Sequence, residues 1–198
     1  TFTINVTENS IDLNPKETEA NDSITEADVI SSGYAISGKI SSYADKDYFK
    51  LATSSSGKIS VQFSGGTADQ YYHSVSILDS SENVLASKRL DDSGSVTSNT
   101  LAAGDFYVLV NNSLATNDYS LTATFSSTTE TRESENNDTV IQADTLALGT
   151  ETKGQSSSYT DVDYYKVGVA APGTVTLLFK GSSSNYLYHT IELVDASE

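Results

Sequence analysis

Two groups of acidic and amide side chains in this chain have the types and spacing of metal ligands. Within each group, oxygen-bearing residues lie two positions apart, so in an extended segment they point to the same side. Carboxylate and amide oxygens are the ligands of hard cations, and Ca²⁺ takes about six to eight of them at flexible geometry. We therefore expect a calcium site formed by the following residues: Glu17, Glu19, Asn21, Asp22, Asp45 and Asp47.

The same pattern occurs a second time, because segment 17–82 aligns without a gap with segment 133–198, at an offset of 116 residues. A single Asn-Asp pair would fit the start of a helix equally well, and acidic loops are usually solvated. Clustered like charges repel one another unless a cation neutralises them, however, and here the whole pattern is kept twice with its internal spacing. We expect a second calcium site from the matching residues: Glu133, Glu135, Asn137, Asp138, Asp161 and Asp163.

Short stretches in which apolar and polar residues alternate follow one another along the chain. The clearest are Phe49–Leu51, Ile59–Phe63, Val75–Ile77, Phe106–Val110 and Tyr119–Phe125. A period of two with one polar face predicts antiparallel strands, and the Gly-containing turns between them predict an all-β sandwich of two sheets. One short helix is expected after each acidic segment, because residues 23–26 and 139–142 fit the capping-box pattern.

The repeat divides the chain into a complete copy and a partial one. A period of this length fits the common size of a domain, whereas the second copy stops where the first still has several strands to come. Its apolar face would be exposed, so either partner strands come from another molecule or the chain is a trimmed piece of a longer array. The expected parts are a leading strand and linker at 1–16, a complete sandwich at 17–126, a linker at 127–132 and the partial copy at 133–198.

The composition excludes several partners and chemistries. With 27 acidic against 11 basic residues, the formal charge is −16, so nucleic acids and anionic membranes would be repelled. Cysteine is absent, which excludes disulfides and a thiol nucleophile. The sequence has no apolar run long enough to span a membrane and no export leader. We expect a mature fragment of a secreted protein in which calcium takes the stabilising place of disulfides.

Other candidate sites are less specific. His73 and His189 are equivalent in the repeat, but His73 has the parity of the apolar residues in its strand, which favours the edge of the core over a metal site. No Gly-x-Ser-x-Gly elbow is present and the paired acids follow the calcium pattern, so we expect no enzyme. An exposed aromatic platform for a polysaccharide or fibrous protein would use Tyr71, Tyr72 and Tyr107, although ordinary packing explains these residues too.

The order of these motifs resembles a known family. Over residues 17–125, the Glu-x-Glu-x-Asn-Asp segment, Gly38, the Asp-x-Asp-Tyr-Phe-Lys stretch and the Gly-Asp-Phe-Tyr-Val-Leu-Val strand are similar to the bacterial pre-peptidase C-terminal domain, which is related to the collagen-binding domains of clostridial collagenases. The resemblance implies a jelly-roll-like β-sandwich appended to a secreted peptidase or another exoprotein. It also implies calcium ligands at the acidic positions named above. Collagen affinity is not implied.

These observations predict a non-catalytic, calcium-binding accessory module of a secreted bacterial protein, in which calcium fixes the linker to the sandwich. Two alternatives stay open on the sequence alone. One is a module that binds an extracellular polysaccharide or fibrous protein, and the other is a calcium-stiffened spacer repeat of a surface adhesin. Self-association through the partial second copy is a further expectation.

Overall fold

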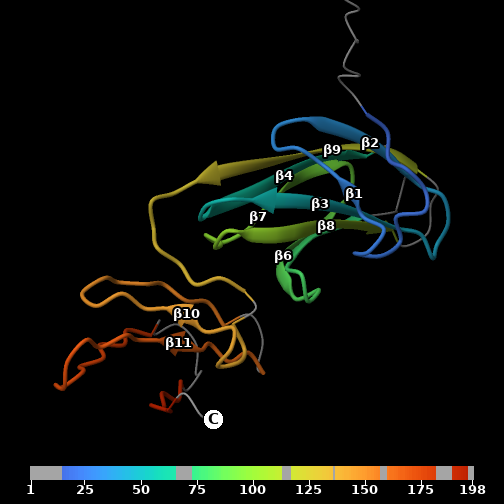
Figure 1. Cartoon of the computed structure of the whole chain (residues 1–198). Coiled ribbons are helices and arrows are strands. Elements are labelled where there is room, and N and C mark those ends of the chain that lie inside the picture. Colours follow the sequence, from blue (N-terminus) through green and yellow to red (C-terminus); the bar gives the residue numbers. More distant parts are fainter. Residues whose placement is uncertain are drawn as a thin grey trace, which may run out of the picture.

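Two β-sheets packed face to face form the first copy of the repeat (Figure 1). The computed structural model describes residues 15–65, 73–112, 117–135, 137–156, 160–181 and 189–195. One sheet has the strand order β1 (Asp28–Val29), β3 (Lys46–Thr53), β8 (Gly104–Asn112), β5 (His73–Leu78) and β6 (Val84–Leu90). The other has the order β2 (Ala35–Ile40), β9 (Asn117–Ser127), β4 (Gly57–Gly65) and β7 (Ser93–Thr97).

The strands follow a jelly-roll path. β2 pairs with β9, β3 with β8, β4 with β7 and β5 with β6, all antiparallel, so the chain is a long hairpin folded about the β5–β6 turn. Additional β4–β9 and β5–β8 pairs roll this hairpin into two sheets. The expected all-β, jelly-roll-like antiparallel sandwich is confirmed. The short β1 is an exception, since it joins the edge of β3 in parallel.

Alternation along the strands places the apolar side chains between the sheets. In β4, Ile59, Val61 and Phe63 are buried, whereas Lys58 and Gln62 are exposed. Burying a side chain of this size contributes about 1.5–3 kcal/mol to stability. The same core receives apolar residues from the other long strands, among them Ile40, Phe49, Val75, Val108 and Leu121.

The prediction of a short helix after each acidic segment is wrong, because the described chain forms only a turn at each of the two positions. In the first copy, Glu26 N donates to Ser23 O at 3.0 Å and the Ser23 hydroxyl donates to Glu26 Oε2 at 2.9 Å. The following Asp28–Val29 pairs with β3 instead, and Ile30 N donates to Lys50 O. Short isolated helices are marginal, so pairing with a sheet edge prevails. Among the described residues, no helix is long and apolar enough to cross a membrane.

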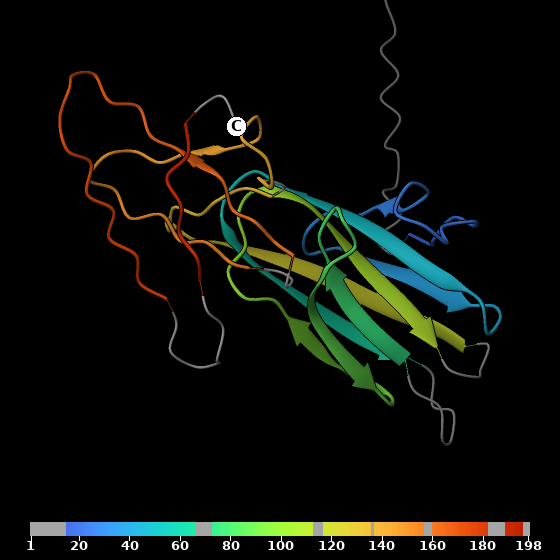
Figure 2. The same cartoon turned by 90° about the horizontal axis from the view of Figure 1, so that it is seen from below.

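In its described residues, the second copy has counterparts of β1 and β3 but does not form the two sheets. Its described residues form only β10 (Asp144–Thr145) and β11 (Tyr165–Lys166), which pair in parallel as β1 and β3 do. Figures 1 and 2 show this part beside the sandwich, joined to it by the chain that follows β9. After β11, large apolar side chains are exposed: Val175 by 48%, Leu177 by 56%, Phe179 by 49%, Ile191 by 50% and Leu193 by 96%.

We expect Phe49→Ala to destabilise the first copy by about 3–5 kcal/mol, because the ring is fully buried and its loss leaves a cavity. Val29→Ala, at a side chain that is 80% exposed on the neighbouring edge strand, should change stability by at most about 0.5 kcal/mol. Urea unfolding followed by circular dichroism measures both variants. Equal effects of the two replacements would contradict a core role for Phe49.

Candidate metal centre

Three carboxylates of the first copy converge where the incoming chain meets the sandwich. Glu17, Glu19 and Asp47 each offer an oxygen, and these oxygens lie within 4.8 Å of one another. The two glutamates come from the segment that precedes the sandwich, whereas Asp47 belongs to β3 and is fully buried. The structure thus brings three of the six residues predicted for this site into one cluster.

Backbone pairing with β2 positions the glutamates. Ser37 N donates to Pro15 O and Glu17 N donates to Ser37 O, both at 2.9 Å, so the incoming segment runs parallel beside β2. Gly38 permits a close approach at this point. A Cβ on Gly38 would lie 2.3 Å from the Tyr119 ring and 2.5 Å from Glu17 Oε2. Any side chain there would therefore displace the glutamate or the tyrosine.

The hydroxyl of Tyr119, on β9, connects the carboxylates of the incoming segment and of β3. It donates to Asp47 Oδ2 and, at 3.1 Å, to Glu17 Oε2. Burial, together with these two neighbouring charges, raises the pKa of Tyr119. Asp47 Oδ1, by contrast, is buried and has no hydrogen-bond partner among the described residues. A buried oxygen of this kind is costly unless a further group satisfies it.

The other three residues predicted for this site surround the cluster. Asn21 is fully buried, and its Oδ1 lacks a hydrogen-bond partner in the described part of the chain. Asp22 Oδ1 accepts from Lys46 N at 3.1 Å, and Asp45 Oδ2 accepts from Ser41 N. The two aspartates thus stabilise the backbone of the loop before β3 and are not members of the three-carboxylate cluster.

The second copy repeats the cluster. Oxygens of Glu133, Glu135 and Asp163 lie within 4.8 Å of one another, and Asp163 Oδ1 is again buried without a partner among the described residues. Glu133 N donates to Lys153 O at 3.1 Å, which matches the pairing of the first copy. Gly154 again allows the close approach, since a Cβ there would lie 2.6 Å from Glu133 Oε2.

The remaining residues predicted for the second site also have counterparts in the first. Asn137 is fully buried, and neither its side-chain nitrogen nor its side-chain oxygen has a hydrogen-bond partner among the described residues. Asp138 Oδ1 accepts from Val162 N at 3.4 Å. The charge of Asp161 contributes to the raised pKa of Glu133, whose largest cause is burial.

A different tyrosine contacts the second cluster. The Tyr165 hydroxyl, from β11, donates to Glu133 Oε2. The equivalent position in the first copy is Phe49, and there the hydroxyl comes from Tyr119 on another strand. Burial and the hydrogen bond to Glu133 raise the pKa of Tyr165. The two clusters therefore make the same contact with phenols from non-equivalent positions.

Sequence reasoning missed both tyrosines and a pair of acids. Asp28 Oδ2 accepts from Thr18 N at 2.7 Å, and Asp144 Oδ2 accepts from Ser134 N at 2.5 Å, so each acid holds the acidic segment in place. Because Asp28 and Asp144 recur at the repeat offset, the alignment offered a signal for them. No local pattern points to Tyr119.

Burial and mutual repulsion raise the pKa values of the clustered carboxyl groups. For Asp47, burial and the charges of Glu17 and Asp45 raise the pKa to about 8. In the second copy, burial followed by neighbouring charges raises the pKa of Glu135 to about 8 and that of Asp163 to about 7. Each cluster therefore holds negative charge that a proton or a cation would relieve.

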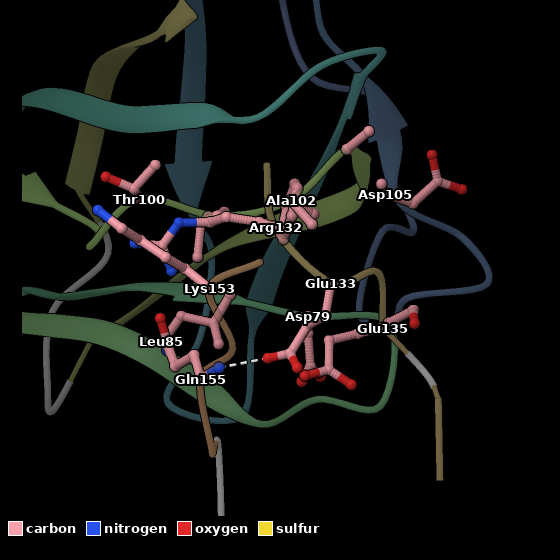
Figure 3. Close-up of a pocket in the computed structure, with 15 residues that line it drawn as sticks. Asp79, Leu85, Thr100, Ala102, Asp105, Arg132, Glu133, Glu135, Lys153 and Gln155 are labelled. Atoms are coloured by element: carbon pink, nitrogen blue, oxygen red, sulfur yellow. Dashed lines mark hydrogen bonds between the residues drawn. The ribbon is translucent and has the colours of Figure 1, made fainter. Parts of the chain in front are cut away.

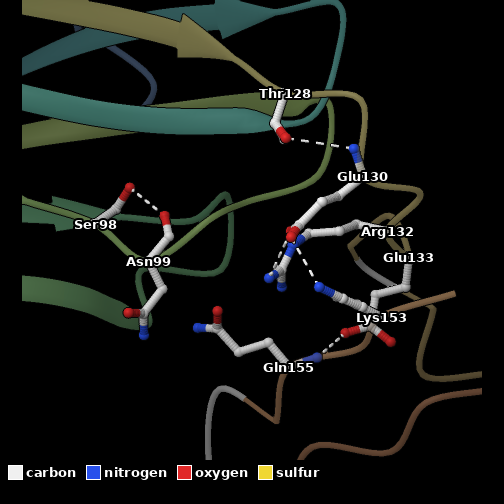
Figure 4. Close-up of polar contacts among 8 residues, drawn as sticks. All are labelled: Ser98, Asn99, Thr128, Glu130, Arg132, Glu133, Lys153 and Gln155. Carbon is white, nitrogen blue, oxygen red and sulfur yellow. Dashed lines mark hydrogen bonds and ion pairs between the residues drawn. The ribbon is translucent and has the colours of Figure 1, made fainter.

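The second cluster lies at the junction with the first copy. Glu133 and Glu135 line a pocket together with the β5–β6 turn and the β7–β8 loop (Figure 3). Beside it, Glu130 forms ion pairs with Arg132 at 3.4 Å and with Lys153 at 2.8 Å (Figure 4). The Glu130–Lys153 pair is largely exposed, and such pairs contribute only about 0–1 kcal/mol. The backbone pairing of Arg132 and Glu133 with Lys153 is therefore the firmer connection between the linker and the second copy.

The expected aromatic platform does not include Tyr107. Its side chain is only 7% exposed and packs with Tyr48 and Leu78, so it has little surface to offer a polymer. Ordinary packing, the alternative explanation from the sequence, accounts for this residue. Tyr71 and Tyr72 lie outside the described residues.

The metal-free protein should lose stability as the pH rises from 6.5 to 8.5. The pKa of Asp47 is about 8 in the folded protein, well above its value of about 3.9 in an unfolded chain, so the folded state binds more protons across this range. Melting temperatures in the presence of a chelator measure the effect. His73, whose pKa is lowered by burial, acts in the opposite direction, and most of its effect lies below pH 6.5.

Two variants test whether the titration of Asp47 causes this loss of stability. Asp47→Asn removes the titrating group of the first cluster and should reduce the fall in melting temperature, to which Glu135 and Asp163 of the second cluster still contribute. Asp91→Asn, at an exposed carboxylate outside both clusters, should leave the fall unchanged. A wild-type melting temperature that rises between pH 6.5 and 8.5 would contradict the buried, proton-binding state of Asp47.

Comparison with known proteins returns similar folds at low sequence identity. No protein-family model matches the chain, and no curated protein does. Among solved structures, the chain is similar to the pre-peptidase C-terminal domain of a collagenase from Bacillus anthracis, with 15% identity and a TM-score of 0.41 over 49% of this chain and 93% of that one. It is also similar to PliG of Aeromonas hydrophila, a periplasmic lysozyme inhibitor of g-type lysozyme, with 11% identity and a TM-score of 0.38 over 57% of this chain and 99% of that one.

Proposed function

We propose that this protein is a non-catalytic, calcium-binding β-sandwich module in which the cation fixes the incoming chain to the sandwich. One observation carries the proposal. In both copies, two glutamates of the acidic segment meet an aspartate whose Oδ1 is buried and has no hydrogen-bond partner among the described residues. A cation bound there would neutralise the cluster and supply the missing partner of that oxygen.

The ligand chemistry favours calcium over other metals. The clustered oxygens lie within 4.8 Å of one another, and two oxygens on opposite sides of a Ca²⁺ ion are about 5 Å apart, at a Ca–O distance of about 2.3–2.6 Å. The clusters contain oxygen donors without histidine or cysteine, which disfavours zinc and copper. Magnesium demands a near-ideal octahedron, whereas ligands on a flexible linker suit the looser geometry of calcium.

The position of the glutamates connects cation binding to the linker. Glu17 and Glu133 each pair their backbone with a strand-like segment of their own copy, and each extends a carboxylate toward an aspartate of β3 or its equivalent. Without the cation, the repulsion between these carboxylates opposes that docking. With the cation, the same groups would attract the linker to the sandwich, so calcium would set the geometry at each junction.

The proposal places the protein outside the cell. Extracellular modules typically bind calcium in the range of about 10⁻⁴–10⁻³ M, and a bound cation would stabilise a chain that has no cysteine and therefore no disulfide. An accessory role beside an exoenzyme, or a spacer role in a tandem array, follows from the same calcium-fixed junctions. The partner would then be an extracellular protein or polysaccharide.

Calcium titration of the metal-free protein tests the proposal. At a calcium concentration of 100 times Kd, binding should stabilise the fold by about 2.7 kcal/mol, which raises the melting temperature by several degrees. The gain should be lost in the first copy with Asp47→Asn and in the second with Asp163→Asn, because each replacement removes one of the three clustered carboxylates. Asp91→Asn serves as the control outside both clusters.

Terbium provides a direct measure of occupancy at each site. The chain has 12 tyrosines and no tryptophan, and a tyrosine hydroxyl contacts each cluster, so Tb³⁺ bound there should emit after tyrosine excitation. Calcium should displace it. No change in melting temperature at millimolar calcium, or terbium emission that is unchanged in the Asp47→Asn, Asp163→Asn double variant, would sink the proposal.

A further inference from the structure

An acid outside the first cluster holds the backbone between the two clustered glutamates. Thr18, which has a glutamate on each side in the sequence, donates its N to Asp28 Oδ2 at 2.7 Å. Asp28 begins β1, and β1 pairs with β3, the strand that carries Asp47. The position of both glutamates is therefore connected to the strand that supplies the third carboxylate.

The same oxygen of Asp28 also receives the side chain of Asn21. Asn21 Nδ2 donates to Asp28 Oδ2 at 3.4 Å. An ionised carboxylate only accepts hydrogen bonds, so the amide must present its nitrogen to Asp28 and its oxygen to another side. That oxygen, Asn21 Oδ1, is buried and has no hydrogen-bond partner among the described residues. Asp28 thus sets which end of the amide is left for a further group.

Asn21 is connected to the cluster on two sides. It lies two residues after Glu19, and its carbonyl oxygen accepts from the N of Tyr48, the residue after Asp47, at 3.0 Å. Its side chain is fully buried, and a buried polar atom without a partner costs about 1–3 kcal/mol. Side-chain amide oxygens are common calcium ligands. A cation in the cluster would satisfy this oxygen.

We propose that Asp28 is a positioning residue of the first cation site, which turns the Asn21 amide so that its oxygen joins the three carboxylates as a ligand. This inference rests on the proposed calcium-binding function. Asp28 is not among the clustered carboxylates, so it acts through Thr18 and Asn21. Replacing a group that orients metal ligands typically lowers metal affinity by about 10–100-fold.

The second copy has the equivalent acid with a different set of partners. Asp144 Oδ2 accepts from Ser134 N at 2.5 Å, and Asp144 Oδ1 accepts from the Ser134 hydroxyl at 2.7 Å. Asn137 is buried, but neither end of its amide has a hydrogen-bond partner among the described residues. Asp144 therefore holds the acidic segment as Asp28 does, without orienting the amide. The chain thus contains a matched site in which only one of the two effects is present.

The affinity of the first site for terbium tests the role of Asp28. The chain with Asp163→Asn isolates this site, because only the first cluster then keeps its three carboxylates. In that chain, Asp28→Ala should weaken terbium binding by about 10–100-fold. Asp28→Asn loses the charge, but its oxygen can still accept from Thr18 N and Asn21 Nδ2, so its affinity should stay within about fivefold of the parent chain. An equal loss in both variants would show that Asp28 acts through its charge alone and would overturn the proposal.

The number of water molecules on the bound terbium identifies the ligand that Asp28 positions. Coordinated water shortens the emission lifetime in ordinary water but not in heavy water, so the two lifetimes give that number. Asp28→Ala should add about one water, because the place of the Asn21 oxygen is left to the solvent. Asn21→Ala should add the same water, and the double variant should add no more than either replacement alone. An unchanged water number in Asp28→Ala would overturn the proposal, as would an unchanged number in Asn21→Ala should the first variant not fold.

The second site and a surface acid provide the controls. In the chain with Asp47→Asn, where only the second cluster is complete, Asp144→Ala should weaken terbium binding without adding a water. An added water there would overturn the assignment of that water to the place of the amide oxygen. Asp91→Ala, at an exposed carboxylate outside both clusters, should change neither quantity. If the chain with Asp163→Asn binds no terbium, the proposed function itself fails, whereas unchanged affinity in Asp28→Ala overturns only the role of Asp28.

Discussion

The buried carboxylate of Asp47 is the constraint on which the rest of the first copy depends. It lies where β3, the Tyr119 hydroxyl of β9 and the incoming Glu17 meet, so both sheets and the linker converge on one charge. Taking a charged carboxylate out of water is costly unless it is paired. The nearest charged groups, Glu17 and Glu19, carry the same sign and repel the charge of Asp47, so a proton or a cation is needed to relieve it.

The nested hairpin is the second constraint, and it explains the contrast between the two copies. In this topology no long strand among β2 to β5 pairs with another of that set, so the described residues that match them in the second copy have no sheet partners among one another. A meander would behave differently, because its first strands pair with each other. The exposed Leu177 and Leu193 therefore follow from the jelly-roll order and not from a weak apolar pattern.

The sequence predicted the parts of this structure that depend on local pattern. Alternation identified five of the long strands, and spacing identified the glutamates and Asp47 of the first cluster. It failed where a distant contact overrides a local preference. The turn at Ser23 has the side chains of a helix start, yet Asp28–Val29 joins β3. Tyr119 lies 72 residues from Asp47, and only the fold shows that the two side chains meet.

The locality of contacts also explains why the partial copy keeps its acidic cluster without its sandwich. The second cluster is assembled from the acidic segment, from Gln155, whose N donates to Glu133, and from Asp163 and Tyr165 at the start of β11. All of these lie within residues 133–165. In the first copy the phenol comes from β9, whereas in the second Tyr165 supplies it from the strand next to the cluster. Contacts close in sequence cost less chain entropy to form than the pairing of β2 with β9. The acidic cluster is therefore the more autonomous unit, and the sandwich is the part that needs the remaining strands.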